Sequence, residues 1–337
     1  MQKNKIEFNE GRRIFSVTIN DSVFEVPSIL DNIKVWDPEE FDIYSFKHKY
    51  LSENSIFRIY FEESSIAGWI IPIQSLESEE HDYAKDEHFS SAAWIALYKL
   101  LQQQEILSES QSGLSKYHPE TAILLLSKSE IGKIANFNIE HYLPSLFRLG
   151  YDNQKAPDDC LAEIVKNIRL ESISPALRTE TFFIDLFKSA INSEKNDIVT
   201  FLLLYQVIEI LIFDIFQDGI KHCLDKFINL NEDQYDEYWE LSYEMYDAKK
   251  EKTRIKKLLS PEYTNIPNQP TLTAHCNELL VGIGKKEESN LSQALYATRN
   301  NIVHAYRLFK EPQKDKLKIL LPEFVNLIID ILITYKR

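Results

Sequence analysis

Hydrophobic and polar residues alternate along much of the first 75 residues, as they do in strands that bury one face. The alternation is clearest in four runs rich in β-branched and aromatic residues: residues 13–19, 23–26, 55–61 and 66–73. Asn20 and Asp21 separate the first two runs, a pattern typical of a tight hairpin turn. These segments predict a β-sheet in the N-terminal part of the chain.

The hydrophobic pattern changes to a helical period further along the chain. An acidic loop over residues 77–87 precedes a predicted helix at residues 90–104, residues 121–126 fit either a helix or a strand, and residues 161–168 fit a short helix. From about Thr179 onward nearly every segment has helical periodicity. A Ser/Pro cluster at residues 172–176 is typical of a linker. We therefore predict an α+β domain over residues 1–175, an all-α domain over residues 176–337, and a mainly α protein overall.

Composition supports a globular, helix-rich protein. The 337 residues include only 8 Gly, and the 3 Cys are widely scattered, which excludes a disulfide framework and favours a reducing compartment. No apolar leader follows Met1, so we expect a cytoplasmic location. Charged residues interrupt the apolar stretches at residues 201–216 and 317–335, which predicts buried core helices and no membrane partner.

Charge is distributed unevenly. The chain carries a net charge of −14, and residues 1–100 hold 10 Lys and Arg against 18 Asp and Glu. Residues 291–337 have the opposite balance, with 8 basic and 4 acidic side chains. A polyanion should therefore meet the C-terminal end of the chain, although the N-terminal excess is also what ordinary solvated surface charge would give.

Familiar catalytic motifs are missing or incomplete. The run Gly282-Ile-Gly284-Lys-Lys286 lacks the first glycine and the final Ser/Thr of a phosphate-binding loop, and no G-x-S-x-G occurs. The adjacent pairs His222-Cys223 and His275-Cys276 lack zinc spacing, because neighbouring residues on a helix point about 100° apart. His81 and His88 lie in the acidic loop and form a weak metal candidate. We expect no metal and no cofactor.

One predicted helix, residues 235–246, is rich in aromatic residues. The aromatics fall at helical spacing on one face. Aromatic rings can stack on bases, but the acidic residues between them would repel phosphates. We therefore expect this face to pack inside the protein. The members of the face are Tyr235, Tyr238, Trp239, Tyr243 and Tyr246. The basic run that follows, residues 249–257, has the right sign for RNA.

Residues 295–309 stand apart, because two stripes appear when they are placed on a helix at about 100° per residue. The apolar stripe comprises Leu295, Ile302, Tyr306 and Phe309, and Arg299 lies on it. A buried, unpaired guanidinium is too costly, so Arg299 should meet an acid such as Glu209 or Asp214, or open onto a cleft or subunit interface. The second stripe comprises Tyr296, Asn300, His304 and Arg307, groups that can bind a phosphodiester and transfer protons on it.

The run from Arg299 to His304, R-N-x-x-x-H, resembles the R-x4-6-H signature of HEPN domains. Residues 203–211 are similar to the earlier helix of that family, with its Tyr-Gln-x-x-Glu pattern at Tyr205, Gln206 and Glu209. The resemblance covers roughly residues 178–337, with an insertion near residues 218–290. The N-terminal half resembles no family that we can name.

The resemblance implies a metal-independent endoribonuclease with a role as a toxin or antiviral defence effector. His304 would act as general base or acid, Arg299 would neutralise the phosphorane, and Asn300 would orient the phosphate or the imidazole. Arg307 and Tyr296, on the same stripe, would help to bind RNA. By analogy, residues 1–175 would be a sensor or regulatory domain that answers to a protein trigger or inhibitor.

Arg299 and His304 are five residues apart, which on one helix leaves them about 140° apart. A symmetric homodimer would bring groups from two chains to each site, and the apolar residues 324–335 could provide bundle or dimer packing. Two alternatives stay open. The bundle could be a non-catalytic binding or assembly module in which Arg299 only pairs with Glu209, or an unrelated helical protein in which Arg299 and His304 cap a helix.

Overall fold

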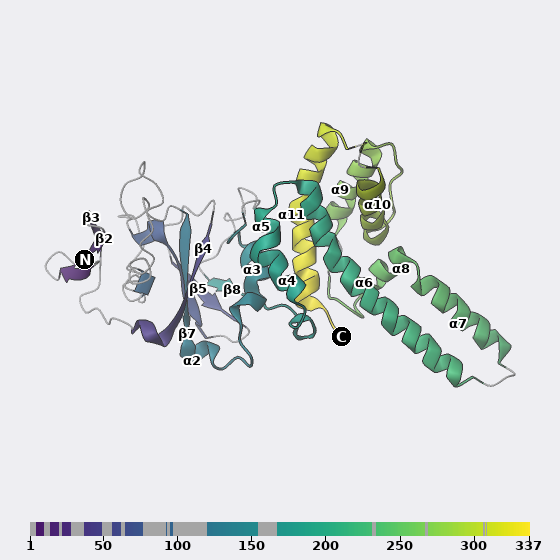
Figure 1. Cartoon of the computed structure of the whole chain (residues 1–337), viewed down its shortest axis with the longest axis horizontal. Helices are drawn as coiled ribbons and strands as arrows, with labels where there is room; N and C mark the ends of the chain where they lie inside the picture. Colours follow the sequence, from purple (N-terminus) through teal and green to yellow (C-terminus); the bar gives the residue numbers. More distant parts are fainter. Residues whose placement is uncertain are drawn as a thin grey trace. The chain divides into compact units, whose positions relative to one another are not determined.

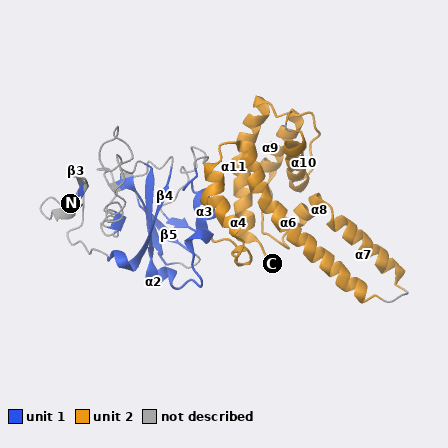
Figure 2. Ribbon diagram, in the orientation of Figure 1, with its two compact units in different colours: residues 1–171 blue, residues 172–337 orange. Residues whose placement is uncertain are grey.

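The computed structural model describes residues 5–9, 14–19, 22–27, 37–48, 56–61, 65–76, 92, 95–96, 120–153, 167–230, 234–266, 269–305, 307 and 309–337. Over these residues the protein is mainly helical, with a three-stranded sheet and a small mixed sheet of five strands (Figure 1). The chain divides into two compact units, residues 1–171 and 172–337 (Figure 2). Residues 172–175, predicted to belong to the first domain, are therefore part of the second unit.

The first unit begins with a three-stranded antiparallel sheet. Its strands, in order, are β1 (Lys5–Asn9), β2 (Ile14–Ile19) and β3 (Ser22–Pro27). β2 and β3 are the predicted hairpin, with Ile19 opposite Ser22. The expected turn residues Asn20 and Asp21 lie outside the described part of the chain. β1 is a strand that the alternation did not predict.

A second sheet has five strands in the order β4-β7-β6-β5-β8. Its neighbours are antiparallel except for β5 and β8, which run parallel. The strands are β4 (Phe41–Lys47), β5 (Phe57–Tyr60), β6 (Gly68–Pro72), β7 (Thr121–Ser127) and β8 (Asn167–Arg169). The two runs predicted at residues 55–61 and 66–73 are confirmed as β5 and β6.

For three strands of this sheet the sequence prediction was ambiguous, wrong or missing. Residues 121–126, which fitted a helix or a strand, form strand β7. The helix predicted for residues 161–168 is wrong at its end, because Asn167–Arg169 pairs with β5 as a strand; residues 161–166 are not among those described. β4 was missed because its apolar residues fall at both odd and even positions, which hides the two-residue period.

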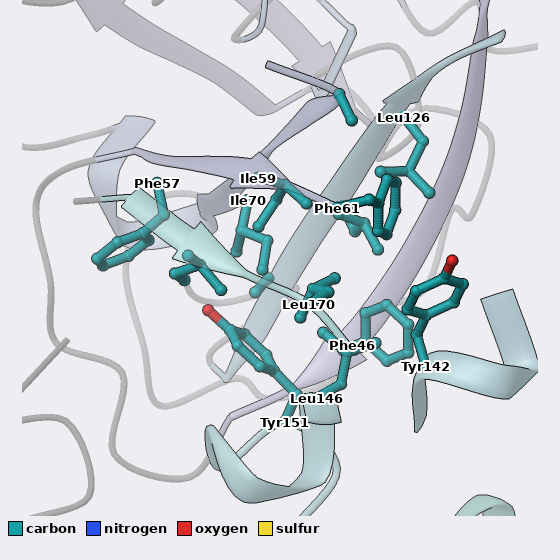
Figure 3. Packing of buried hydrophobic residues seen from close by; sticks show 14 of the residues in the cluster. Phe46, Phe57, Ile59, Phe61, Ile70, Leu126, Tyr142, Leu146, Tyr151 and Leu170 are labelled. Carbon is teal, nitrogen blue, oxygen red and sulfur yellow. The ribbon is translucent and has the colours of Figure 1, made fainter. Parts of the chain in front are cut away.

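One hydrophobic cluster of the first unit lies on one face of the five-stranded sheet. Alternate residues of β7, namely Ala122, Leu124 and Leu126, contribute to it, and Figure 3 shows Leu126, Tyr142 and Leu146 among the residues of this cluster. The short helix α3 (Leu143–Arg148) and the 3-10 turn Ile139–Tyr142 cover this face. The intervening residues of β7 are also buried, so both faces of this strand are covered.

The helix predicted at residues 90–104 falls mostly outside the described residues. Ala92, Ile95 and Ala96 are described, and all three are helical and fully buried. Their spacing matches the apolar face of the predicted helix.

All the regular elements in the described part of the second unit are helices, in agreement with the helical periodicity predicted from Thr179 onward. Its short N-terminal helices are α4 (Thr181–Asp185), a π-helical turn (Leu186–Ala190) and α5 (Ile191–Ser193). The longer ones are α6 (Asp197–Ile228), α7 (Tyr235–Ala248), α8 (Glu251–Leu258), α9 (Pro270–Gly282), α10 (Leu291–His304) and α11 (Glu311–Thr334). The C-terminal half of α6 pairs with α7 and projects from the rest of this unit (Figure 1).

The two apolar stretches predicted as core helices are the centres of α6 and α11. Phe201 on α6 stacks on Phe324 of α11, with ring centroids 4.6 Å apart. By length and composition α6 could cross a membrane, but residues such as Leu204, Ile208 and Leu211 are fully buried within the unit, as in a core helix. Residues 324–335 also lie largely in this core, so they are used within the chain and leave little apolar surface for a dimer.

Local sequence signals set the ends of these helices. The side chains of Asn196 and Asn290 accept backbone hydrogen bonds at the starts of α6 and α10. Gly284, with φ of 76°, ends α9, where Lys285 N–H donates to the Leu280 carbonyl and Gly284 N–H donates to the Val281 carbonyl. The glycine-rich run that resembled a phosphate loop is therefore a helix C-terminus, where carbonyls and not amide donors are exposed.

Candidate functional site

Helix α10 carries the candidate residues Arg299, Asn300 and His304. Its apolar face packs into the core of the second unit and fixes its position. Leu295, Thr298 and Ile302 are buried, which confirms the predicted core position of Leu295 and Ile302. The helix ends at His304, so the assumption that it continues to Phe309 is wrong. The chain has to turn before α11 begins at Glu311, and Phe309 reaches the core from this connection instead.

Arg299 projects from the buried side of α10 and meets an acid, one of the two outcomes that its position predicted. One of its terminal nitrogens forms an ion pair with a carboxylate oxygen of Glu209 on α6. The other, Nη1, donates to Oδ1 of Asn300 at 3.0 Å. The exposed fractions of the Arg299 and Glu209 side chains are 24% and 37%, so the pair lies at the edge of the core.

Two further groups complete the surroundings of Arg299. The ring of Tyr205, also on α6, lies against the Arg299 guanidinium. The distance from the ring centroid to Cζ of Arg299 is 5.7 Å. The Tyr205 hydroxyl donates to Oε1 of Glu251, in the first turn of α8, at 3.0 Å. Burial raises the pKa of Tyr205, and the charge of Glu251 raises it further. Burial lowers the pKa of Arg299, but the hydrogen bond and charge of Glu209 outweigh this and give a net increase. Arg299 is therefore a fixed cation.

Asn300 is oriented by its neighbour. The bond from Arg299 to its Oδ1 fixes the orientation of the amide, whose side-chain nitrogen is a donor. The next residue, Asn301, bonds back to the Ala297 carbonyl at 2.8 Å and is occupied within the helix. An amide donor and a guanidinium thus occupy adjacent positions on the same turn.

The remaining predicted site residues lie further along the chain or at the surface. His304 is the last residue of α10 and is exposed. Arg307 is also exposed but lies beyond the helix, so its assignment to the helical stripe is wrong. Tyr296 is half-buried one turn before Asn300. The structure therefore brings Arg299, Asn300 and Glu209 together and leaves His304 accessible at the helix end.

The His-Cys pairs have separate environments. Cys223 and Cys276 are buried, and burial raises the pKa of the Cys276 thiol to about 12. Nδ1 of His275 lies 3.3 Å from Oε2 of Glu323. Among the residues that the structure describes, no three His, Cys, Asp or Glu side chains gather as metal ligands would. His81 and His88 fall outside that set.

The aromatic face of α7 does not pack as expected. Tyr238 packs beside Phe227, with ring centroids 5.8 Å apart, and Leu241 is buried. The other four aromatics are exposed by 61–71% of their surface: Tyr235, Trp239, Tyr243 and Tyr246. α6 covers one narrow side of α7, and the aromatic side points elsewhere. The following basic run forms α8, where Arg254 lies over the ring of Phe216 at 5.3 Å and is partly structural.

Glu251 is the site residue that sequence reasoning missed. Tyr205 and Glu209 are one turn apart on α6, so their pattern is visible in the sequence. Glu251 is 46 residues from Tyr205 and lies in a run dominated by lysine, so no local signal marks it. Compared with models of known protein families, with curated proteins and with solved structures, the chain matches none.

Proposed function

We propose that this protein is a metal-independent endoribonuclease of the HEPN type that acts as a homodimer. The observation that carries the proposal is the set on α10: a fixed guanidinium at Arg299, an amide donor at Asn300 and an exposed imidazole at His304. These three groups supply charge stabilisation, orientation and proton transfer, the functions that cleavage of a phosphodiester requires. The proposed role as a toxin or antiviral effector rests only on the resemblance to HEPN domains.

The chemistry uses the nucleophile already present in RNA. His304 removes the proton from a 2′-hydroxyl, the 2′-oxygen forms a bond to the adjacent phosphorus, and the bond from phosphorus to the 5′-oxygen breaks. The 5′-oxygen takes up a proton, which leaves a 2′,3′-cyclic phosphate and a 5′-hydroxyl. Arg299 offsets the added negative charge on the phosphorane.

Glu209 has a positioning role in this proposal. A guanidinium has five N–H donors, and the bonds to Glu209 and Asn300 use two of them. The others remain to meet a phosphate. Because Glu209 cancels part of the positive charge, further cations are needed near the RNA, and the exposed Arg307 is the candidate.

The separation of the groups along one helix supports the homodimer. Arg299 is anchored on the α6 side of α10, whereas His304 ends the helix. A two-fold axis near the end of α10 would place His304 of one protomer beside Arg299 of its partner. Mixing Arg299→Ala with His304→Ala protein should then change the activity relative to either parent, because mixed dimers contain a different set of sites.

The direct test replaces His304 by alanine and measures cleavage of a labelled RNA. We expect loss of cleavage with little change in thermal midpoint, because an exposed terminal side chain contributes little to stability. His222→Ala is the matched control, since His222 is also exposed on a helix and lies outside the site. Products formed in excess EDTA should carry a 2′,3′-cyclic phosphate. Wild-type levels of cleavage in His304→Ala protein, or products with 5′-phosphates, would contradict the proposal.

One observation favours a second candidate, a non-catalytic binding or assembly module. The ion pair with Glu209 neutralises Arg299 within the chain, as a purely structural arginine would require. This candidate predicts no cleavage by the wild-type protein and a loss of stability in Arg299→Ala. The acidic first domain would then regulate binding instead of cleavage.

A further inference from the structure

Helix α7 carries an ordered pattern of aromatic and acidic residues. Each of its four exposed rings is followed directly by a carboxylate, and the rings recur at intervals of three or four residues. At about 100° per residue the rings occupy an arc of about 80°, and the carboxylates lie on the adjacent arc. The pairs are Tyr235 with Asp236, Trp239 with Glu240, Tyr243 with Glu244, and Tyr246 with Asp247. We call these eight residues the α7 face.

One of these pairs already holds a cation in the folded chain. The Lys250 ammonium lies 4.6 Å from the centroid of the Tyr246 ring. The same nitrogen is 2.6 Å from Oδ1 of Asp247. A ring and the carboxylate beside it therefore bind one lysine together, by a cation–π contact and an ion pair. The other three pairs repeat the sequence of a ring followed by a carboxylate along the helix.

The surroundings add to the negative charge of the α7 face. α7 has Asp236 and Glu237 in its first turn and contains no Lys or Arg. A groove of about 490 Å³ between α6 and α7 is lined by Glu237, Glu240 and Glu244. Lys226 neutralises part of this charge, 3.7 Å from Glu244. The helix pair projects from the rest of the unit, so a partner could approach the α7 face (Figure 1).

We propose that the α7 face is a docking site for a lysine- or arginine-rich segment of a partner protein. Exposed rings attract cations, and the neighbouring carboxylates fix them and exclude RNA by like-charge repulsion. Residues four apart on a helix rise about 6 Å, so a basic helix with cations at every fourth position would match successive pairs. The proposal is independent of the ribonuclease activity, because the α7 face includes none of the residues of the α10 site.

The test uses the full-length protein and fluorescence anisotropy. The probe is a labelled, alanine-based helical peptide with lysine at every fourth position; the same peptide with glutamate replacing lysine is the negative probe. We expect binding of the lysine peptide that weakens with added salt, and none of the glutamate peptide. Trp239→Ser/Tyr243→Ser should weaken binding by about tenfold or more, because two ring contacts are lost.

Ile319→Ser is the matched control, since Ile319 is 59% exposed on α11, away from the α7 face, and its loss should leave binding unchanged. Circular dichroism of each variant checks that the fold is intact. Absence of binding at low salt, or equal binding by the folded Trp239→Ser/Tyr243→Ser variant, would overturn the proposal. So would a light-scattering mass that is dimeric for the wild-type protein and monomeric for the Trp239→Ser/Tyr243→Ser variant, or direct binding of a labelled single-stranded RNA that this variant loses.

Discussion

Arg299 keeps its charge at the edge of a hydrophobic core because three groups on two helices meet it. Glu209 supplies the opposite charge, Asn300 accepts a hydrogen bond, and Tyr205 lies against the guanidinium. Both partners of the ion pair remain partly exposed, so water screens the attraction between them and lowers its contribution to stability. The pair therefore serves to hold the guanidinium in one orientation more than to stabilise the fold.

A double-mutant cycle with Arg299→Ala and Glu209→Ala should measure this coupling. We expect about 1–2 kcal/mol from urea unfolding, since a hydrogen-bonded charge at the edge of a core is worth more than a surface pair. The control cycle on Glu311 and Lys314, an exposed pair three residues apart, should give about 0.5 kcal/mol or less. Equal coupling in the two cycles would show that the Arg299 pair is no more fixed than a surface contact.

At the scale of single elements, α9 ends because Gly284 adopts a left-handed backbone conformation. The φ of 76° costs an L-residue steric energy, whereas glycine adopts it freely. A Cβ at this position would have no atom within 4 Å, so crowding plays no part. Only the backbone conformation requires glycine here.

Gly284→Ala should therefore lower the free energy of unfolding by about 1 kcal/mol, and Gly284→Asn by less, because asparagine tolerates this conformation better. Gly219→Ala is the contrasting variant. Gly219 is within α6, and its added Cβ would lie at an ordinary 3.8 Å from the Cβ of Ala248. It should stabilise the protein by about 0.5–1 kcal/mol. Chemical denaturation measures both. An unchanged free energy of unfolding in Gly284→Ala protein would show that the end of α9 can rearrange without cost.

At the scale of the whole molecule, each unit has its own hydrophobic core, and the second one begins earlier than the Ser/Pro cluster suggested. Ser174 N–H donates to the Leu332 carbonyl at 2.8 Å, and its hydroxyl donates to the Tyr335 carbonyl at 2.6 Å. Ile173 and Leu177 are buried in the same unit. The residues just after position 171 thus anchor the end of α11.

A fragment of residues 172–337 should fold cooperatively by itself, with helical circular dichroism and a single unfolding transition. A fragment of residues 179–337 should be less stable by several kcal/mol, roughly the sum of two buried apolar side chains and the Ser174 hydrogen bonds. If the acidic first unit only restrains the second, the longer fragment should cleave RNA at least as well as the full chain. A folded but inert fragment 172–337 would mean that the first unit contributes to the site.

Much of this arrangement is determined by the sequence alone. Periodicity and β-branched or aromatic composition located the strands β2, β3, β5 and β6 and predicted the helical character of the second unit, because both signals are local to each segment. The same reasoning predicted that Arg299 would meet an acid or open onto a cleft or subunit interface, since a guanidinium among core positions cannot remain unpaired. These conclusions depend only on a residue and its neighbours along the chain.

Only the tertiary structure decided which groups meet. Glu209 and Asp214 were both possible partners of Arg299; Asp214 instead bonds to Arg337 at 2.9 Å, a contact between residues 123 positions apart. Helix α10 stops at His304 because the chain must turn toward α11, and the rings of α7 stay exposed because α6 covers only the Leu241 side. A sequence pattern shows that a face is apolar, whereas packing between distant segments determines whether anything covers it.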